Sequence, residues 1–157
     1  MRWFLGLGAN LGDREAALRF AIEALGRDGD VRVLRASSVY GTDPVGGPEQ
    51  PPYLNAVIEV ETDLDPHALL DRALAIEAER GRIRAERWGP RVLDIDLLAG
   101  TTDDGAPIRI DDERLVVPHP RMRERGFVLV PLAELTGEHV TPDPGVRRAG
   151  PPLPLPR

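Results

Sequence analysis

The sequence contains no cysteine and no lysine, and only 4% of its 157 residues are aromatic. The missing cysteine excludes disulfide frameworks, thiolate zinc sites and thiol nucleophiles. The missing lysine excludes a standard P-loop and leaves arginine as the permanently charged basic side chain of this protein. A compositional bias of the whole chain would explain the missing lysine equally well, so only local clustering of arginine can indicate function.

Long apolar runs are also missing. None approaches the roughly 20 residues of a membrane helix, and no signal peptide is recognisable, so we expect a cytoplasmic protein. The 26 acidic residues outnumber the 20 basic ones, and the net charge of −6 argues against broad binding to nucleic acid or membranes. The length fits one domain, which we expect over residues 1–139, followed by a Pro-rich tail over 140–157 with little pattern.

The apolar pattern predicts an alternation of strands and helices. Strands are expected over 3–7, 31–40, 55–62 and 92–99, with short ones at 108–110 and 115–117. Helices are expected after the N-caps Asp13 and Asp65, and over 120–124 and 127–135. The order strand, helix, two strands, helix, strand is that of the ferredoxin-like split βαβ sandwich. We therefore expect an α+β fold with a mainly antiparallel sheet.

Two aspartates stand out in VLDIDLLA, the most apolar run of the chain. Asp94 and Asp96 share one parity of the predicted strand and Leu93, Ile95 and Leu97 the other, so both carboxylates project from one face of the sheet. A carboxylate pair with some waters is the usual way in which proteins hold Mg²⁺ against substrate phosphates. A solvent-exposed sheet face would accommodate the same pattern.

Five arginines lie close before this pair, namely Arg80, Arg82, Arg84, Arg87 and Arg91. Mg²⁺ to bridge phosphate oxygens, with guanidinium groups for the remaining charge, suits phosphoryl transfer. A salt-bridged surface without a function is the alternative. Residues 6–10, GLGAN, are either a weak match to a Gly-rich phosphate-binding turn or a strand end made of small residues.

Residues 87–98, RWGPRVLDIDLL, resemble the signature of the 6-hydroxymethyl-7,8-dihydropterin pyrophosphokinases, a family of the folate pathway. This family is also called 2-amino-4-hydroxy-6-hydroxymethyldihydropteridine diphosphokinase. Other segments agree with the family in order and spacing, namely residues 8–12, 38–44, 50–55, 77–84, 117–119 and 125–127. The resemblance extends from residue 3 to about residue 135, so it leaves out the tail.

The resemblance implies a catalytic domain that transfers the pyrophosphoryl group of ATP to the hydroxymethyl oxygen of the pterin and releases AMP. Asp94 and Asp96 would bind two Mg²⁺ ions, and they would form the catalytic set with Arg82 and Arg91. Residues 81–90 would be a lid over both substrates, with a fixed, ion-paired loop as the alternative. The residues implied to bind ATP are Glu77, Arg82, Arg84, Trp88, Arg91, Leu97, His119 and Arg125.

The resemblance also implies a pterin site, made of Thr42, Pro44, Val45, Tyr53, Asn55, Trp88 and Phe127. A flat bicyclic ring can stack between two aromatic faces while an asparagine satisfies its amide edge. Tyr53 and Phe127 are among few aromatic residues here, although either one alone is more often a core residue.

Two other functions fit the same fold class. A noncatalytic nucleic-acid or phosphate-binding module is disfavoured by the acidic composition and the sparse aromatic residues. A catalytically weak homologue retained for partner binding is disfavoured by the intact set of aspartates and arginines. We therefore expect a cytoplasmic, monomeric, Mg²⁺-dependent transferase that binds ATP and the pterin and has no nucleic-acid or membrane partner.

Overall fold

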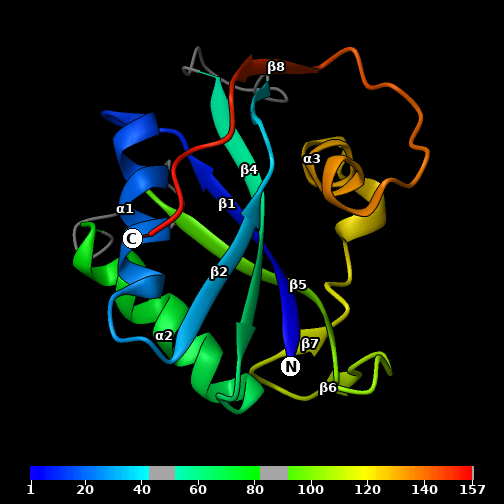
Figure 1. Cartoon of the computed structure of the whole chain (residues 1–157). Coiled ribbons are helices and arrows are strands. Elements are labelled where there is room, and N and C mark those ends of the chain that lie inside the picture. Colours follow the sequence, from blue (N-terminus) through cyan, green and yellow to red (C-terminus); the bar gives the residue numbers. More distant parts are fainter. Residues whose placement is uncertain (43–51, 82–91, 157) are drawn as a thin grey trace.

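The structure, a computed structural model, describes residues 1–42, 52–81 and 92–156 (Figure 1). Its helices and strands follow in the order β1 (Arg2–Ala9), α1 (Arg14–Gly26), β2 (Val31–Ala36), β3 (Val39–Thr42), β4 (Tyr53–Thr62), α2 (Pro66–Glu79), β5 (Asp94–Thr101), β6 (Ile110–Asp111), β7 (Val116–Val117), the 3-10 helix η2 (Met122–Glu124), α3 (Gly126–Thr136) and β8 (Val146–Gly150). Each helix and strand predicted from the sequence overlaps a helix or strand of the structure, although the helix at 120–124 is a short 3-10 helix and the strand at 31–40 is divided.

The main sheet has the strand order β5-β1-β4-β3-β8, with β2 also paired to β4, and neighbouring strands are antiparallel. The chain forms two βαβ units, β1-α1-β2 and β4-α2-β5. Strand β4 lies between β1 and β2, and β1 lies between β4 and β5, so a strand of each unit separates the two strands of the other. The expected α+β class with a mainly antiparallel sheet is confirmed.

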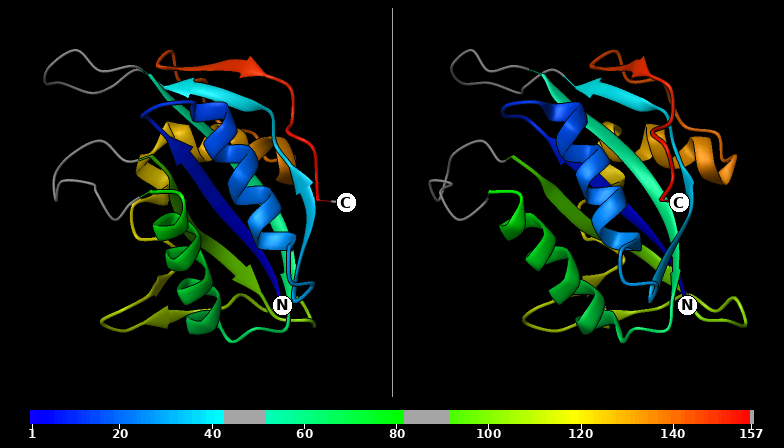
Figure 2. Two further views of the ribbon diagram at one scale, coloured as in Figure 1. Left: turned by 90° about the vertical axis from the view of Figure 1, so that its left-hand side faces the viewer. Right: turned by 60° about the vertical axis from the view of Figure 1, so that its left-hand side comes forward.

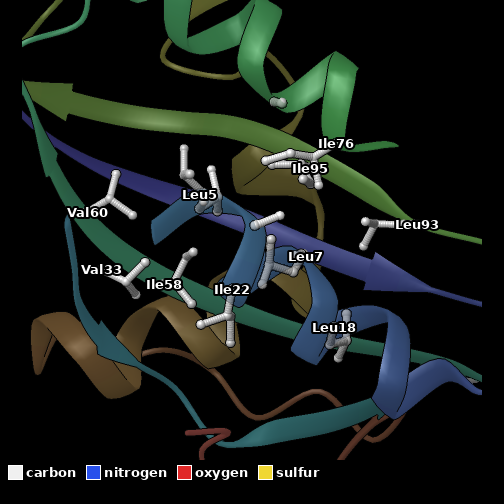
Figure 3. Packing of buried hydrophobic residues seen from close by; sticks show 14 of the residues in the cluster. Leu5, Leu7, Leu18, Ile22, Val33, Ile58, Val60, Ile76, Leu93 and Ile95 are labelled. Atoms are coloured by element: carbon white, nitrogen blue, oxygen red, sulfur yellow. The ribbon is translucent and has the colours of Figure 1, made fainter. Parts of the chain in front are cut away.

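The helices cover the two faces of this sheet unequally. Helices α1 and α2 lie side by side on one face, and α3 lies on the other (Figures 1 and 2). Figure 3 shows how Leu5 and Leu7 of β1 pack with Leu18 and Ile22 of α1 in the larger hydrophobic cluster. The two-residue period of a strand sends the intervening positions of β1 to the α3 face.

The two predicted N-caps differ in outcome. Asp13 caps α1, since its Oδ1 accepts a hydrogen bond from the Ala16 amide at 3.0 Å. Asp65 also occupies the N-cap position of α2, as predicted, but its side chain makes no capping hydrogen bond and lies 4.0 Å from His67 Nδ1. Pro66 begins α2 as expected. None of the helices in the described ranges is long and apolar enough to cross a membrane.

The predicted strand over 31–40 is two strands, with a break at Ser37 and Ser38. Hydrogen bonds to β4 bridge the break: the Ser37 amide donates to the Val57 carbonyl at 2.8 Å, and Ser37 Oγ accepts from the Val57 amide at 2.9 Å. The chain can therefore leave the regular ladder here without losing its partners.

A second difference lies in residues 140–157, for which the sequence pattern indicates no regular structure. Strand β8 pairs with β3 and extends the sheet, and the chain then returns across the edge toward α1 (Figure 1). Leu153 is buried in the larger cluster, and Pro156 lies against Gly26 at the end of α1. Part of this segment is therefore packed onto the domain.

Candidate active site

A cavity of about 330 Å³ lies between the sheet and the first turn of α3. Residues from β1, β3, β4, β5 and α3 line it. Its volume is in the range of small-molecule binding sites. Four residues predicted to bind the pterin line it, namely Thr42, Tyr53, Asn55 and Phe127, together with Asp94, Asp96 and Arg125.

The floor of the cavity is formed by two glycines of β1. Gly8 is paired with Asp94 on one side and Asn55 on the other, and Gly6 is paired with Asp96. Directly paired residues of antiparallel strands share a face, so the missing side chains leave space between these polar groups. A Cβ atom on Gly8 would lie only 3.1 Å from Asn55 Oδ1.

These glycines also decide between the two interpretations of GLGAN. Both Gly6 and Gly8 lie within β1, paired on both sides. The weak match to a phosphate-binding turn is therefore wrong, and the strand-end interpretation is confirmed.

The two aspartates lie on the face that their spacing predicts. Leu93, Ile95 and Leu97 are buried in the larger core cluster, while the half-buried Asp94 and Asp96 line the cavity. Their Cα atoms are roughly 7 Å apart, as expected for alternate residues of a strand. The sheet face that carries them is therefore a cavity wall and not an open, solvated surface.

The chemistry of this donor set fits Mg²⁺, which prefers oxygen ligands and usually keeps waters and substrate phosphates as its other ligands. In the described part of the chain, no group of three or more acids and histidines could hold a metal ion. Two carboxylates beside a cavity large enough for a substrate suit an ion that is completed by the substrate.

Glu77 lies behind the aspartate pair. The residue is only 3% exposed, and its Oε2 accepts a hydrogen bond of 2.8 Å from the amide of Ile95, the residue between Asp94 and Asp96. This contact holds the strand that carries both acids.

Leu97, also predicted to bind ATP, has its side chain in the larger core cluster on the other face of the sheet.

A cation and an aromatic ring meet at the α3 side of the cavity. The Arg125 guanidinium lies 5.5 Å from the centre of the Phe127 ring, and both residues line the cavity. Arg125, predicted to bind ATP, and Phe127, predicted to bind the pterin, are therefore neighbours. Such a cation over a ring is a stabilising contact in itself and also leaves charge available to an anion.

His119 is held next to this region by its main chain, because its amide donates to the Leu98 carbonyl of β5 at 2.8 Å. Its Nδ1 accepts a hydrogen bond from the Arg121 amide at 3.2 Å. Burial lowers the pKa of the His119 imidazole below 6.5, Asp96 opposes this effect, and Arg125 and Arg121 reinforce it. The neutral ring therefore carries its proton on Nε2.

On the sheet side of the cavity, Asn55 and Thr42 are bonded to each other. Asn55 is 6% exposed, and its Nδ2 donates to Thr42 Oγ1 at 2.7 Å. The amide group is thereby oriented beside the cavity. Tyr53 is directly opposite Thr42 in the β3–β4 register.

Several predicted residues lie outside the described residues, namely Pro44, Val45, Arg82, Arg84, Trp88 and Arg91. The predicted lid at 81–90 also lies there, apart from Gly81.

The sequence reasoning missed some features of the site. Val57 and Val128 add apolar lining, and Gly6 and Gly8 form the floor. The alternation of glycine with Leu5 and Leu7 was a usable signal, because it leaves one face of a central strand bare. Valines give no such signal, since they are ordinary in any strand or helix.

Fold and site together define an α+β protein with a small-molecule cavity, in which two carboxylates, an arginine and aromatic rings meet on one face of the sheet. The family model described as 7,8-dihydro-6-hydroxymethylpterin-pyrophosphokinase matches residues 4–137. The chain belongs to this family.

Individual relatives agree with this assignment. The chain is 49% identical over 148 residues to a 2-amino-4-hydroxy-6-hydroxymethyldihydropteridine pyrophosphokinase of Methylorubrum extorquens, covering 94% of this chain and 90% of the relative. It is 47% identical over 132 residues to the protein of the same name from Bacillus subtilis, covering 84% and 76%. The Haemophilus influenzae protein of that name is 39% identical over 140 residues, covering 89% and 84%.

Proposed function

We propose that this protein transfers the pyrophosphoryl group of ATP to 6-hydroxymethyl-7,8-dihydropterin in folate biosynthesis. The observation that carries the proposal is the shared cavity, in which Asp94 and Asp96 face the same space as Asn55 and Phe127. The relatives are named for the pterin substrate and for the pyrophosphokinase reaction.

In this reaction the hydroxymethyl oxygen bonds to the β phosphorus of ATP, and the bond from that phosphorus to the oxygen bridging it to the α phosphate breaks. AMP leaves with that oxygen, and the hydroxyl proton is released. Such transfers depend mainly on positioning and on neutralising charge, because the protein forms no covalent intermediate.

The two carboxylates would hold Mg²⁺, with two ions expected when ATP is present. Held by these carboxylates, the ions would supply positive charge that offsets the negative charge of the phosphates. The buried Glu77 carboxylate accepts from the Ile95 amide and so holds the strand segment that carries Asp94 and Asp96. The phosphates would then lie over Gly6 and Gly8, which have no side chains to exclude them.

Cations and donors from the α3 side would complete the ATP site. Arg125 lines the cavity and would supply a guanidinium to the phosphates, and His119 would donate from Nε2 while neutral. Leu97 would act through its main chain, since its side chain is in the core. The resemblance adds Arg84 and Trp88 to ATP binding, and Arg82 and Arg91 as catalytic arginines.

The pterin would enter between Tyr53 and Phe127, where the oriented Asn55 amide can bond to its polar edge. Thr42 orients Asn55, and the resemblance adds Pro44, Val45 and Trp88. Opposed apolar and aromatic surfaces would exclude water from the ring and leave the hydroxymethyl group to point toward the carboxylates.

We expect the protein to act as a cytoplasmic monomer.

The proposal is tested by supplying purified protein with ATP, Mg²⁺ and the reduced hydroxymethylpterin, and by identifying the nucleotide product. AMP and pterin diphosphate should form in a one-to-one ratio, and chelation of Mg²⁺ should stop the reaction. Release of ADP, or AMP formation that does not depend on the pterin, would contradict the proposal.

A further inference from the structure

Glu134, near the end of α3, joins that helix to the sheet. Its Oε1 accepts a hydrogen bond from the Tyr40 hydroxyl at 2.6 Å. Its Oε2 accepts from the Ser38 amide at 2.9 Å and from Ser38 Oγ at 3.2 Å. Hydrogen bonds to a charged carboxylate are stronger than neutral ones, so this is a firm attachment.

Ser38 lies at the break between β2 and β3, where its amide has left the regular ladder. The residue is only 5% exposed, and a buried amide without a partner is costly. Glu134 supplies the acceptor that the ladder does not. Strand β8 joins the same group, because Arg148 Nε donates to Ser38 Oγ at 3.1 Å.

The bond to Tyr40 has a fixed direction. Burial and the Glu134 carboxylate raise the pKa of the Tyr40 phenol to about 12. The hydroxyl therefore stays protonated at neutral pH and donates to the carboxylate. A second contact secures the end of the helix, since Arg35 donates to the Leu135 carbonyl at 2.8 Å.

Tyr40 and Glu134, the two partners of this contact, are each connected to residues that line the cavity. On the sheet, Tyr40 is paired in register with Asn55, which is bonded to Thr42. On the helix, Glu134 follows Phe127 by seven residues, which places both on one side of α3. The contact thus connects the wall that holds the amide group with the wall that holds the aromatic ring.

The helix is continuous between these two positions, but it lacks one of its own hydrogen bonds there. Pro131 lies inside α3 and has no amide hydrogen, so the helical bond to the Phe127 carbonyl cannot form. Phe127 lies in the first turn of α3, so its position follows the packing of this helix on the sheet. Glu134 attaches the helix to the sheet through three hydrogen bonds to Ser38 and Tyr40.

We propose that Glu134 is a positioning residue for pterin binding: by holding α3 against β3, it sets the distance between the Phe127 ring and the Asn55 amide. This inference rests on the proposed function, since the pterin is the ligand concerned. Glu134 itself does not line the cavity, and it acts through Tyr40 and Phe127.

The proposal predicts a selective change in kinetics. Glu134→Ala should raise the KM for the pterin by about three- to tenfold, while the KM for ATP stays within about twofold. Glu134→Gln should restore part of the loss, because the amide keeps an acceptor for Ser38 and a group that can bond to Tyr40. The matched control is Glu61→Ala. Glu61 is a residue of β4 that forms ion pairs with Arg2 and Arg32 and does not line the cavity.

A substrate-free measurement separates this proposal from the proposed function. Hydrogen exchange of residues 126–136 should be faster in Glu134→Ala than in Glu61→Ala, whether or not the protein makes AMP. If Glu134→Ala fails to fold, Tyr40→Phe, which deletes one oxygen, should raise the pterin KM alone. Equal changes in both KM values, an unchanged pterin KM in the folded variants, or unchanged exchange in α3 would overturn the proposal.

Discussion

The two faces of the sheet are built for different tasks. The face under α1 and α2 carries a dense apolar cluster with residues from all the longer strands. The face under α3 has a small cluster, whose buried members among the described residues are Val57, Leu98, Met122 and Val128, and the cavity beside it is lined by acids. One face supplies most of the hydrophobic stabilisation, and the other leaves space and charge for substrates.

Strand β1 shows the difference within one segment. Leu5 and Leu7 are buried on the α1 face, and Gly6 and Gly8 alternate with them and form the cavity floor. Glycine weakens a strand because it has no side chain to pack. The neighbouring strands β4 and β5 hold β1 on both sides, so the fold tolerates this loss at the site.

The largest expected effect is on the cavity face. Asp96→Asn keeps the shape of the side chain but removes the charge that would hold Mg²⁺. AMP formation should fall on the order of 10³-fold or more, with unfolding free energy within about 1 kcal/mol of the original. Asp111→Asn, an exposed aspartate of β6, is the control and should keep its activity. Near-normal turnover of Asp96→Asn at ordinary Mg²⁺ would remove Asp96 from the site.

The next effect is on the α1 face. Leu153 is 5% exposed in the larger cluster, whereas Leu155 is 39% exposed. Leu153→Ala should lower the free energy of unfolding by about 2–4 kcal/mol in urea titrations, and Leu155→Ala should change it little. Both variants should keep the KM for both substrates. If the two cost the same, the C-terminal segment does not contribute to the core.

A smaller effect is expected at the ring-binding wall. Phe127→Ala should raise the pterin KM several-fold and spare ATP, because a stacked aromatic pair contributes about 0.5–1.5 kcal/mol beyond its buried area. The control is Leu132→Ala. Leu132 is a partly buried residue of the same helix that packs against the small cluster, and its truncation should destabilise the fold without changing one KM more than the other. An equal loss of both substrates in Phe127→Ala would make Phe127 a packing residue.

The smallest effect depends on pH. The folded protein raises the pKa of Tyr40 from 10.0 to about 12, so it favours the protonated phenol. The resulting stabilisation is fully present below about pH 10 and is lost as the pH rises toward about 12, because the unfolded chain releases its proton first. Urea midpoints across this window should fall more steeply for the original protein and for Tyr53→Phe than for Tyr40→Phe. Equal slopes would show that burial and the Glu134 carboxylate do not raise the pKa of Tyr40 in the folded protein.

The sequence was sufficient for features that depend on local periodicity. Alternation identified β1 and β4, an apolar run identified β5, and parity alone placed Asp94 and Asp96 on one face. The break at Ser38 could not be predicted, because its amide is satisfied by Glu134 from a helix far along the chain. Strand β8 was missed for a similar reason, since its pairing partner β3 lies at the other end of the sequence.

The candidate site was predictable to the same extent. Its acids and aromatic residues followed from spacing and resemblance, but the part played by Glu77 did not. A buried carboxylate that accepts from the Ile95 amide is visible only once α2 is packed beside β5.

The central claim, that the two faces separate stability from catalysis, is tested most directly on two residues of β1. Gly8→Val places atoms into the cavity beside Asn55, and Leu5→Ala removes a fully buried side chain of the core that does not line the cavity. Both variants are measured for urea unfolding and for pterin-dependent AMP formation. Gly8→Val should lose AMP formation and keep its stability within about 1 kcal/mol, while Leu5→Ala should lose about 2–5 kcal/mol and keep both KM values. A normal pterin KM in Gly8→Val, or a loss of activity in Leu5→Ala without a loss of stability, would contradict the account.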